Sequence, residues 1–274
     1  MENNKLNYAT EIANEINATT AYTAEAKEVT KNNGIKLVGI QITELGSNIS
    51  PIIYVDQFIE LGTSAEDAAE QVVQIYLANA DKNFDLSSLE DWSKAKEVVT
   101  PRLIGINNDV SDFPHKTFCD LYIIYAIQVS KDGAAKVTNQ MLDRWGITLD
   151  ELDRVARENM KPTMMTMAEM LASLGFPMEE VSDMPMYVIT NKSKIYGASS
   201  ILSTEIIDRF DQDMYILPSS VHELIAVPAG DLMAMELGNM IKEINQNEVL
   251  PEEVLGDDPY FFEYATKEIR MVAA

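Results

Sequence analysis

The spacing of apolar residues alternates between helical and extended segments along the chain. Apolar residues recur every three to four positions at the start, which predicts an amphipathic helix over residues 6–30 that ends at an Asn-Asn-Gly turn. The next two runs alternate with polar residues and are β-branched, which predicts a hairpin over 35–42 and 49–58. A helix is then expected to begin near Ser64, because this residue precedes Asp67 by three positions and is a good N-cap.

The centre of the chain has the strongest strand pattern. Residues 118–129 are rich in β-forming side chains, and the turn signal Asp132-Gly133 predicts a hairpin with residues 134–141. Thr148, with Glu151 three positions later, predicts a helix start with a capping box. The remaining predictions are helices over 87–102, 148–160, 163–174, 204–210 and 231–244, and strands over 186–190, 194–202, 214–217 and 222–227.

Predicted hairpins alternate with pairs of predicted helices. This order favours an α+β fold with a mainly antiparallel sheet and helix pairs packed on it, over a doubly wound parallel sheet. The weakest connection is 175–185, which holds one glycine and two prolines between a helix and a strand. We therefore expect an N-terminal α+β lobe over 1–180 and a C-terminal α+β lobe over 181–274, with a single interlocked domain as the alternative.

The charge is strongly negative, since 44 Asp and Glu stand against 21 Lys and Arg, for a net −23. Such a charge argues against direct binding to nucleic acid or to an anionic membrane surface. Two interpretations stay open: a solvated acidic surface that keeps the protein soluble, or an acidic face that docks on a basic protein. The densest acidic segment supplies the predicted binding residues for such docking: Glu252, Glu253, Asp257 and Asp258.

Composition indicates a globular chain. Hydrophobic residues make up 46% of it, and the longest purely apolar run, 121–127, is too short for a membrane-spanning helix. The first residues lack the apolar core of a signal peptide, and the single cysteine, Cys119, cannot form an internal disulfide. Both features lead us to expect a cytoplasmic protein.

Strong catalytic and cofactor motifs are missing, so no cofactor or metal is expected. Two histidines nevertheless sit in compact polar clusters beside predicted strands. In the first, His115 precedes the central strand and Asp120 lies at its start, where a buried carboxylate needs a donor. The two side chains either satisfy backbone amides at the strand entry or contribute to a polar site. Cys119 is expected to pack as a small hydrophobe.

The second cluster contains Ser220, His222 and Glu223, which are the parts of a serine-histidine-acid site. In an extended segment Ser220 and His222 would share a face while Glu223 points away, and working triads normally gather residues from distant parts of a chain. A structural role in a turn is therefore one interpretation. A ligand or metal site built jointly with His115 and Asp120 is another.

Several short motifs carry a resemblance: Lys31-Asn32-Asn33-Gly34, Asn48-Ile49-Ser50-Pro51, Pro114-His115, Tyr196-Gly197-Ala198 and Pro218-Ser219-Ser220-x-His222-Glu223. Together they resemble an uncharacterised family of bacterial proteins, mostly from gut anaerobes and often encoded near mobile elements. The resemblance covers nearly the whole chain, implies a bacterial cytoplasmic protein and points to the same two histidine clusters. The family pattern has an aliphatic residue at Cys119, which argues against cysteine chemistry.

These observations lead to two functional hypotheses. The first is a non-enzymatic acidic interaction protein, in a phage or mobile-element setting, that inhibits a basic nucleic-acid-handling host protein. Its target would be a defence nuclease or CRISPR effector, and it would act by nucleic-acid mimicry. The alternative is a small-molecule enzyme or ligand-binding protein with a polar pocket around His115 and His222. The sequence makes no prediction about oligomeric state.

Overall fold

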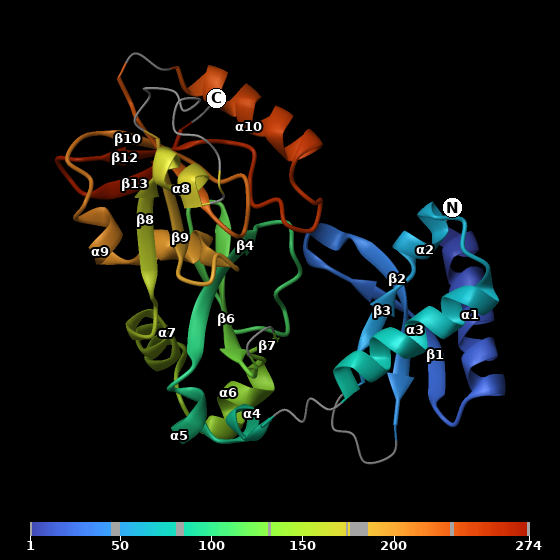
Figure 1. Cartoon of the computed structure of the whole chain (residues 1–274). Helices are drawn as coiled ribbons and strands as arrows, with labels where there is room; N and C mark the ends of the chain where they lie inside the picture. Colours follow the sequence, from blue (N-terminus) through green and yellow to red (C-terminus); the bar gives the residue numbers. More distant parts are fainter. Residues whose placement is uncertain are drawn as a thin grey trace. The chain divides into compact units, whose positions relative to one another are not determined.

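The chain forms two compact units, Met1–Asp85 and Leu86–Ala274, in a computed structural model. The structure describes residues 2–44, 50–80, 85–130, 133–173, 175, 186–230 and 233–272. Both units mix helices with antiparallel sheets (Figure 1), so the predicted α+β class with antiparallel pairing is confirmed. Among the helices that the structure describes, none has the length and apolar composition needed to cross a bilayer.

The first unit is a three-stranded sheet in the order β1-β2-β3 with helices packed on it. Its core consists of apolar residues from α1, α3 and the sheet, and α1 packs against β1, β2 and α3. Its elements are α1 (Glu2–Thr19), β1 (Thr23–Thr30), the 3-10 helix η1 (Asn32–Gly34), β2 (Lys36–Thr43), β3 (Ile52–Tyr54), α2 (Asp56–Glu60) and α3 (Ala65–Ala80).

The predicted helix over 6–30 is wrong beyond Thr19, because the chain turns there and returns as β1. The Asn17 side chain fixes this turn: its amide donates to the Ala24 carbonyl at 2.9 Å and its oxygen accepts from the Ala24 N–H at 2.8 Å. All eight residues of β1 then pair with β2. Pairing with a neighbouring strand therefore outweighs the helical spacing of this segment.

Two other predictions in this unit are confirmed. Strands β2 and β3 pair antiparallel as the expected hairpin, although its Gly-Ser-Asn turn lies outside the described residues and Phe58 belongs to α2. The Ser64 hydroxyl accepts from the Asp67 N–H at 3.1 Å, so Ser64 caps α3.

The second unit contains two antiparallel sheets. One has the order β4-β6-β5 with β7 also paired to β6, and the other has the order β13-β12-β10-β11-β9-β8. The strands are β4 (Val99–Gly105), β5 (Lys116–Phe118), β6 (Leu121–Gln128), β7 (Ala134–Lys136), β8 (Pro162–Thr166), β9 (Tyr187–Asn191), β10 (Met214–Leu217), β11 (Leu224–Pro228), β12 (Tyr260–Glu263) and β13 (Glu268–Met271). The helices are α4 (Ser87–Glu90), α5 (Trp92–Ala95), α6 (Asn139–Trp145), α7 (Leu149–Glu158), α8 (Met167–Ser173), the 3-10 helix η3 (Gly197–Leu202), α9 (Thr204–Ile207) and α10 (Ala234–Asn247).

Buried residues of both sheets form one core, which includes Leu103 of β4 and Ile216 of β10. Successive residues of a strand face opposite sides, so Leu217 points to the other face of its sheet. There it packs with Leu237 and Ile241 of α10 in a smaller cluster. The larger sheet is therefore covered on both faces.

Several predicted boundaries in this unit are wrong. The helix expected over 87–102 is two short helices followed by β4, which pairs with β6 along its whole length. The strand over 118–129 breaks at Cys119, whose positive φ of 52° turns β5 into β6. The helix expected over 163–174 begins as β8, and the strand expected over 194–202 contains η3.

The predicted lobe boundary between 180 and 181 lies outside the described residues. The strands that precede and follow it, β8 and β9, pair antiparallel from Pro162 opposite Asn191 to Thr166 opposite Tyr187. Both strands belong to the second unit, whose described boundary with the first unit falls after Asp85.

A buried ionic network joins α7 to the smaller sheet. Asp153 of α7 accepts hydrogen bonds from the Tyr125 hydroxyl at 2.9 Å, from Arg157 Nε at 3.0 Å and from Lys116 Nζ at 3.1 Å. Burial by itself would raise the pKa of Asp153, but Arg157 and these hydrogen bonds outweigh it and lower the pKa. The carboxylate is therefore charged and satisfied inside the unit.

Candidate functional site

The segment over residues 218–223 runs between β10 and β11 and is held by backbone hydrogen bonds to the segment that follows α10. The Val221 N–H donates to the Glu253 carbonyl at 2.9 Å, and the Leu255 N–H donates to the Ser219 carbonyl at 3.1 Å. Both segments are thus joined as a short pair of extended chains. This pairing fixes the positions of the side chains in the second histidine cluster.

The imidazole of His222 has a polar neighbour at each nitrogen. Nδ1 accepts from the Tyr196 N–H at 3.2 Å, and Nε2 lies within ion-pair distance of Glu253, 3.1 Å from a carboxylate oxygen. The Ser220 hydroxyl accepts from the backbone N–H of His222 at 3.0 Å. Ser220 therefore contacts the main chain of His222, while the ring contacts Tyr196 and Glu253. Burial raises the pKa of Glu223, and the neighbouring Glu253 adds to the rise.

The first histidine cluster has different partners. His115 Nδ1 donates to the Phe113 carbonyl at 2.9 Å, and its ring lies edge-on to Tyr122 with 5.1 Å between ring centres. Asp120 accepts a 2.6 Å hydrogen bond from the hydroxyl of Tyr260, which is fully buried. Each of the two side chains is satisfied by groups near the strand entry.

No described contact joins His115 or Asp120 to His222 or Glu223. Within the described ranges, no group of three or more His, Cys, Asp or Glu side chains is placed to hold a metal ion. The joint metal site that the sequence left open is therefore not formed by these residues. Cys119 packs against the core, and burial, with a contribution from Asp120, raises the pKa of its thiol to about 11.

Three of the four predicted acidic binding residues have partners inside the second unit. Glu253 lies 3.1 Å from His222 Nε2, Asp257 accepts from an Asn245 amide at 2.8 Å, and Asp258 lies 4.0 Å from Lys242. The sequence therefore identified both His222 and Glu253, but assigned them to different sites.

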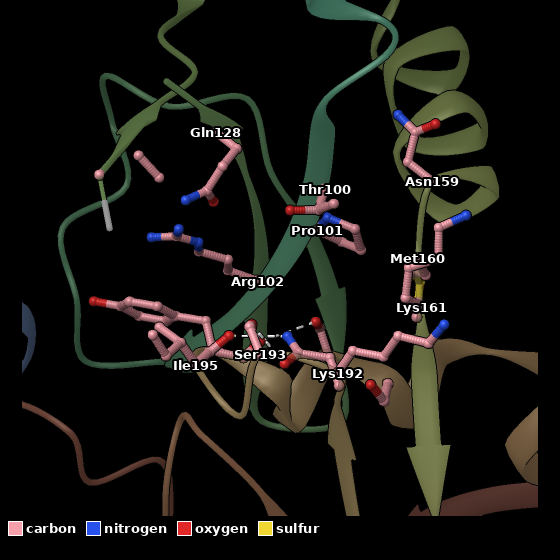
Figure 2. Close-up of a pocket in the computed structure, with 16 residues that line it drawn as sticks. Thr100, Pro101, Arg102, Gln128, Asn159, Met160, Lys161, Lys192, Ser193 and Ile195 are labelled. Atoms are coloured by element: carbon pink, nitrogen blue, oxygen red, sulfur yellow. Dashed lines mark hydrogen bonds between the residues drawn. The ribbon is translucent and has the colours of Figure 1, made fainter. Parts of the chain in front are cut away.

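A cavity of about 620 Å³ opens beside the second histidine cluster. It was not predicted from the sequence. We call it the Arg102 pocket. It is lined by residues 100–102 of β4, 128 and 133–134 at the β6–β7 connection, 159–161 before β8, and 191–193, 195–196 and 199–200 from the end of β9 into η3 (Figure 2). Four segments that are far apart in the sequence therefore meet at one site.

The charge of the pocket is opposite to that of the chain. Three of its lining residues are cationic, namely Arg102, Lys161 and Lys192, and none of the described lining residues is acidic. This is unusual in a chain with 21 basic and 44 acidic side chains. An anion would meet attraction here and repulsion over most other surfaces.

Arg102 is the most buried of the three cations. Its guanidinium carbon lies over the Tyr196 ring, 4.0 Å from the ring centre, which is a cation–π contact. Burial lowers the pKa of Arg102, and Tyr196 opposes this effect. No acidic side chain within the described ranges lies within ion-pair distance of it. A partly desolvated cation without a counter-ion is costly, so an anion bound here would be stabilised.

Tyr196 connects the Arg102 pocket with His222. Its backbone has a left-handed conformation with φ of 50°, and its N–H is held by His222 Nδ1. The next residue, Gly197, has no room for a side chain, because a Cβ there would lie 2.6 Å from the Asn191 nitrogen and 2.6 Å from the His222 carbonyl oxygen. His222 therefore positions the ring on which Arg102 lies.

Comparison with known proteins gives one match. The model of a family of unknown function (DUF5688) matches residues 4–264. No curated protein matches the chain, and no solved structure matches it.

Proposed function

The chain belongs to the DUF5688 family, and from its site we propose that it binds a small anionic molecule in the Arg102 pocket. The observation that supports this proposal is the guanidinium of Arg102 over Tyr196, which has no acidic partner among the described residues and faces a cavity. The cavity volume of about 620 Å³ falls within the range of small-molecule sites.

The contact of Arg102 with Tyr196 favours carboxylate or phosphate as the bound group. The ring packs against the guanidinium carbon at 4.0 Å and has no group that accepts from the N–H groups there, so these donors stay available. Those groups form a planar fork that matches two oxygens of a carboxylate or phosphate. The hydroxyl side chains of Thr100 and Ser193 add neutral hydrogen-bonding groups to the lining of the pocket.

This proposal develops the ligand-binding alternative of the sequence analysis and places the ligand in front of Tyr196. In this proposal His222 does not line the pocket but holds the backbone of Tyr196, which does. His115 is not a lining residue either. The other hypothesis, docking of an acidic face on a basic nucleic-acid-binding partner, stays a prediction that rests on the net charge of −23. Binding to a basic nuclease at low salt, with nucleic acid as competitor, tests it.

The pocket proposal is tested by anion binding to matched arginine variants. Inorganic phosphate, glutarate and fructose 6-phosphate are titrated by calorimetry against the wild type, with glutaramide and fructose as neutral controls. We expect Arg102→Gln to weaken binding of the anions at least about tenfold, since one charge-assisted hydrogen bond contributes about 1.5–3 kcal/mol. The control Arg144→Gln removes an equal charge from an exposed residue of α6 and should leave the affinities unchanged.

Three results would overturn the proposal. The first is equal binding of these anions by the wild type and Arg102→Gln. The second is binding of the neutral controls as tightly as the anions, and the third is that the wild type binds none of the anions.

A further inference from the structure

Two lysines form a second cationic point in the Arg102 pocket. From their placement we infer that the ligand carries two separated anionic groups, one held by Arg102 and the other by Lys161 and Lys192 together. This inference rests on the proposed function and adds the ligand class.

Both lysines line the Arg102 pocket beside the end of the β8–β9 ladder, where Pro162 pairs with Asn191. Lys161 directly precedes Pro162, and Lys192 directly follows Asn191. Like charges gathered at one place repel each other. No acidic side chain of the described ranges lies within ion-pair distance of either lysine. The fold therefore concentrates positive charge at this rim, and an anion would offset the cost.

Arg102 belongs to a different sheet and lies apart from the lysines. In Figure 2 Arg102 is on one side of Thr100 and Pro101, and Lys161 and Lys192 are on the other. The residues between the two cationic points are thus uncharged. A single carboxylate or phosphate on Arg102 would leave the lysine pair without a counter-charge.

The volume of the pocket and the net charge of the protein both bear on a ligand with two anionic groups. A volume of about 620 Å³ is far larger than one phosphate group and leaves room for a connecting skeleton. Long-range repulsion from the net charge of −23 disfavours a doubly charged ligand more than a singly charged one. A preference for two charges must therefore come from local contacts in the pocket.

The test compares probes that carry one anionic group with probes that carry two. Fructose 1,6-bisphosphate is compared with fructose 6-phosphate, and the linear dicarboxylates from succinate to suberate are compared with their half-amides, at constant ionic strength. We expect the wild type to bind the preferred probe with two anionic groups at least about tenfold more tightly than its counterpart with one anionic group. The two probe sets distinguish phosphate from carboxylate as the anionic group.

Variants test whether the lysine pair causes the preference for probes with two anionic groups. Lys161→Gln/Lys192→Gln should reduce it to less than about threefold, because the second anionic group loses its contacts. The control Lys96→Gln/Lys242→Gln makes the same change in net charge at exposed residues outside the pocket and should keep the preference. Both lysines of the pocket are exposed, so the substitutions should not disturb folding, and circular dichroism verifies this.

The outcomes separate this inference from the proposed function. Equal affinity of the wild type for probes with one and with two anionic groups, or an unchanged preference in the pocket-lysine variant, overturns the second cationic point while binding at Arg102 stands. Failure of the wild type to bind any anionic probe overturns the proposed function, and this inference with it.

Discussion

Replacing Asp153 with alanine should strongly destabilise the second unit. The substitution leaves the buried Tyr125 hydroxyl without its acceptor, which costs about 1–3 kcal/mol. Arg157 and Lys116 also lose an anionic partner, but their side chains are 34% and 33% exposed, so water replaces much of that interaction. Each of the two then contributes about 0.5–1 kcal/mol. We therefore expect the free energy of unfolding to fall by about 2–5 kcal/mol.

Urea denaturation followed by tryptophan fluorescence measures this loss. The two tryptophans of the chain, Trp92 and Trp145, lie in the second unit with 5.4 Å between their ring centres, so the signal reports that unit alone. Asp150→Ala is the matched control, because Asp150 contacts Lys116 at 2.8 Å but is 89% exposed. Its loss should cost less than about 0.5 kcal/mol.

The dependence on pH gives a second measurement of the same network. The folded-state pKa of Asp153 is lowered from its ordinary value of 3.8, so its stabilising effect is present above that value. It is lost as the pH falls through the folded-state pKa. The difference between the wild type and Asp153→Ala should therefore be constant near neutral pH and shrink below about pH 4. An effect no larger than that of the Asp150 control, or a difference that grows in acid, would refute this reasoning.

Three further predictions concern the wall of the Arg102 pocket and the cysteine. Gly197→Ala places a Cβ 2.6 Å from the His222 carbonyl oxygen, so urea denaturation should show a loss of about 1–3 kcal/mol; unchanged stability would contradict the close packing. Tyr196→Leu removes the ring beneath Arg102 and should weaken anion binding about threefold to tenfold in calorimetry, whereas Tyr196→Phe should bind like the wild type. Cys119, with a thiol pKa of about 11, should react with iodoacetamide at pH 8 at least about tenfold more slowly than free cysteine, and rapid labelling of the folded protein would show that the thiol is not buried.

Elements with a local signal could be predicted from the sequence. The caps at Ser64 and Thr148 mark real helix starts, and the strand over 214–217 has the predicted bounds. The two segments β1 and β4 were instead assigned to helices, because nothing local distinguishes them. Their strand conformation depends on pairing with β2 and β6, which no local spacing reveals.

In the candidate site, too, single residues could be predicted from the sequence, but their contacts could not. His222 and Glu253 each stood out in the sequence, but only the paired segments around them bring the imidazole within 3.1 Å of the carboxylate. Arg102 falls in the predicted helix over 87–102, and no sequence motif includes it, so the sequence did not identify it as a site residue. One signal in the sequence is the small number of cations, 21 against 44 acidic side chains. A basic residue that the fold leaves without an acidic partner is therefore a candidate anion-binding residue, but only the structure identifies which residue that is.

The outer strands of the sheets have a consequence for association between copies of the chain. An exposed strand edge can pair with another chain, and proline or charge at the edge prevents this. Strand β8 begins with Pro162 and β4 contains Pro101, while β13 carries Glu268 and Arg270 and β1 carries Lys27 among other charges. We expect these four edges to resist strand-to-strand pairing with other copies of the chain.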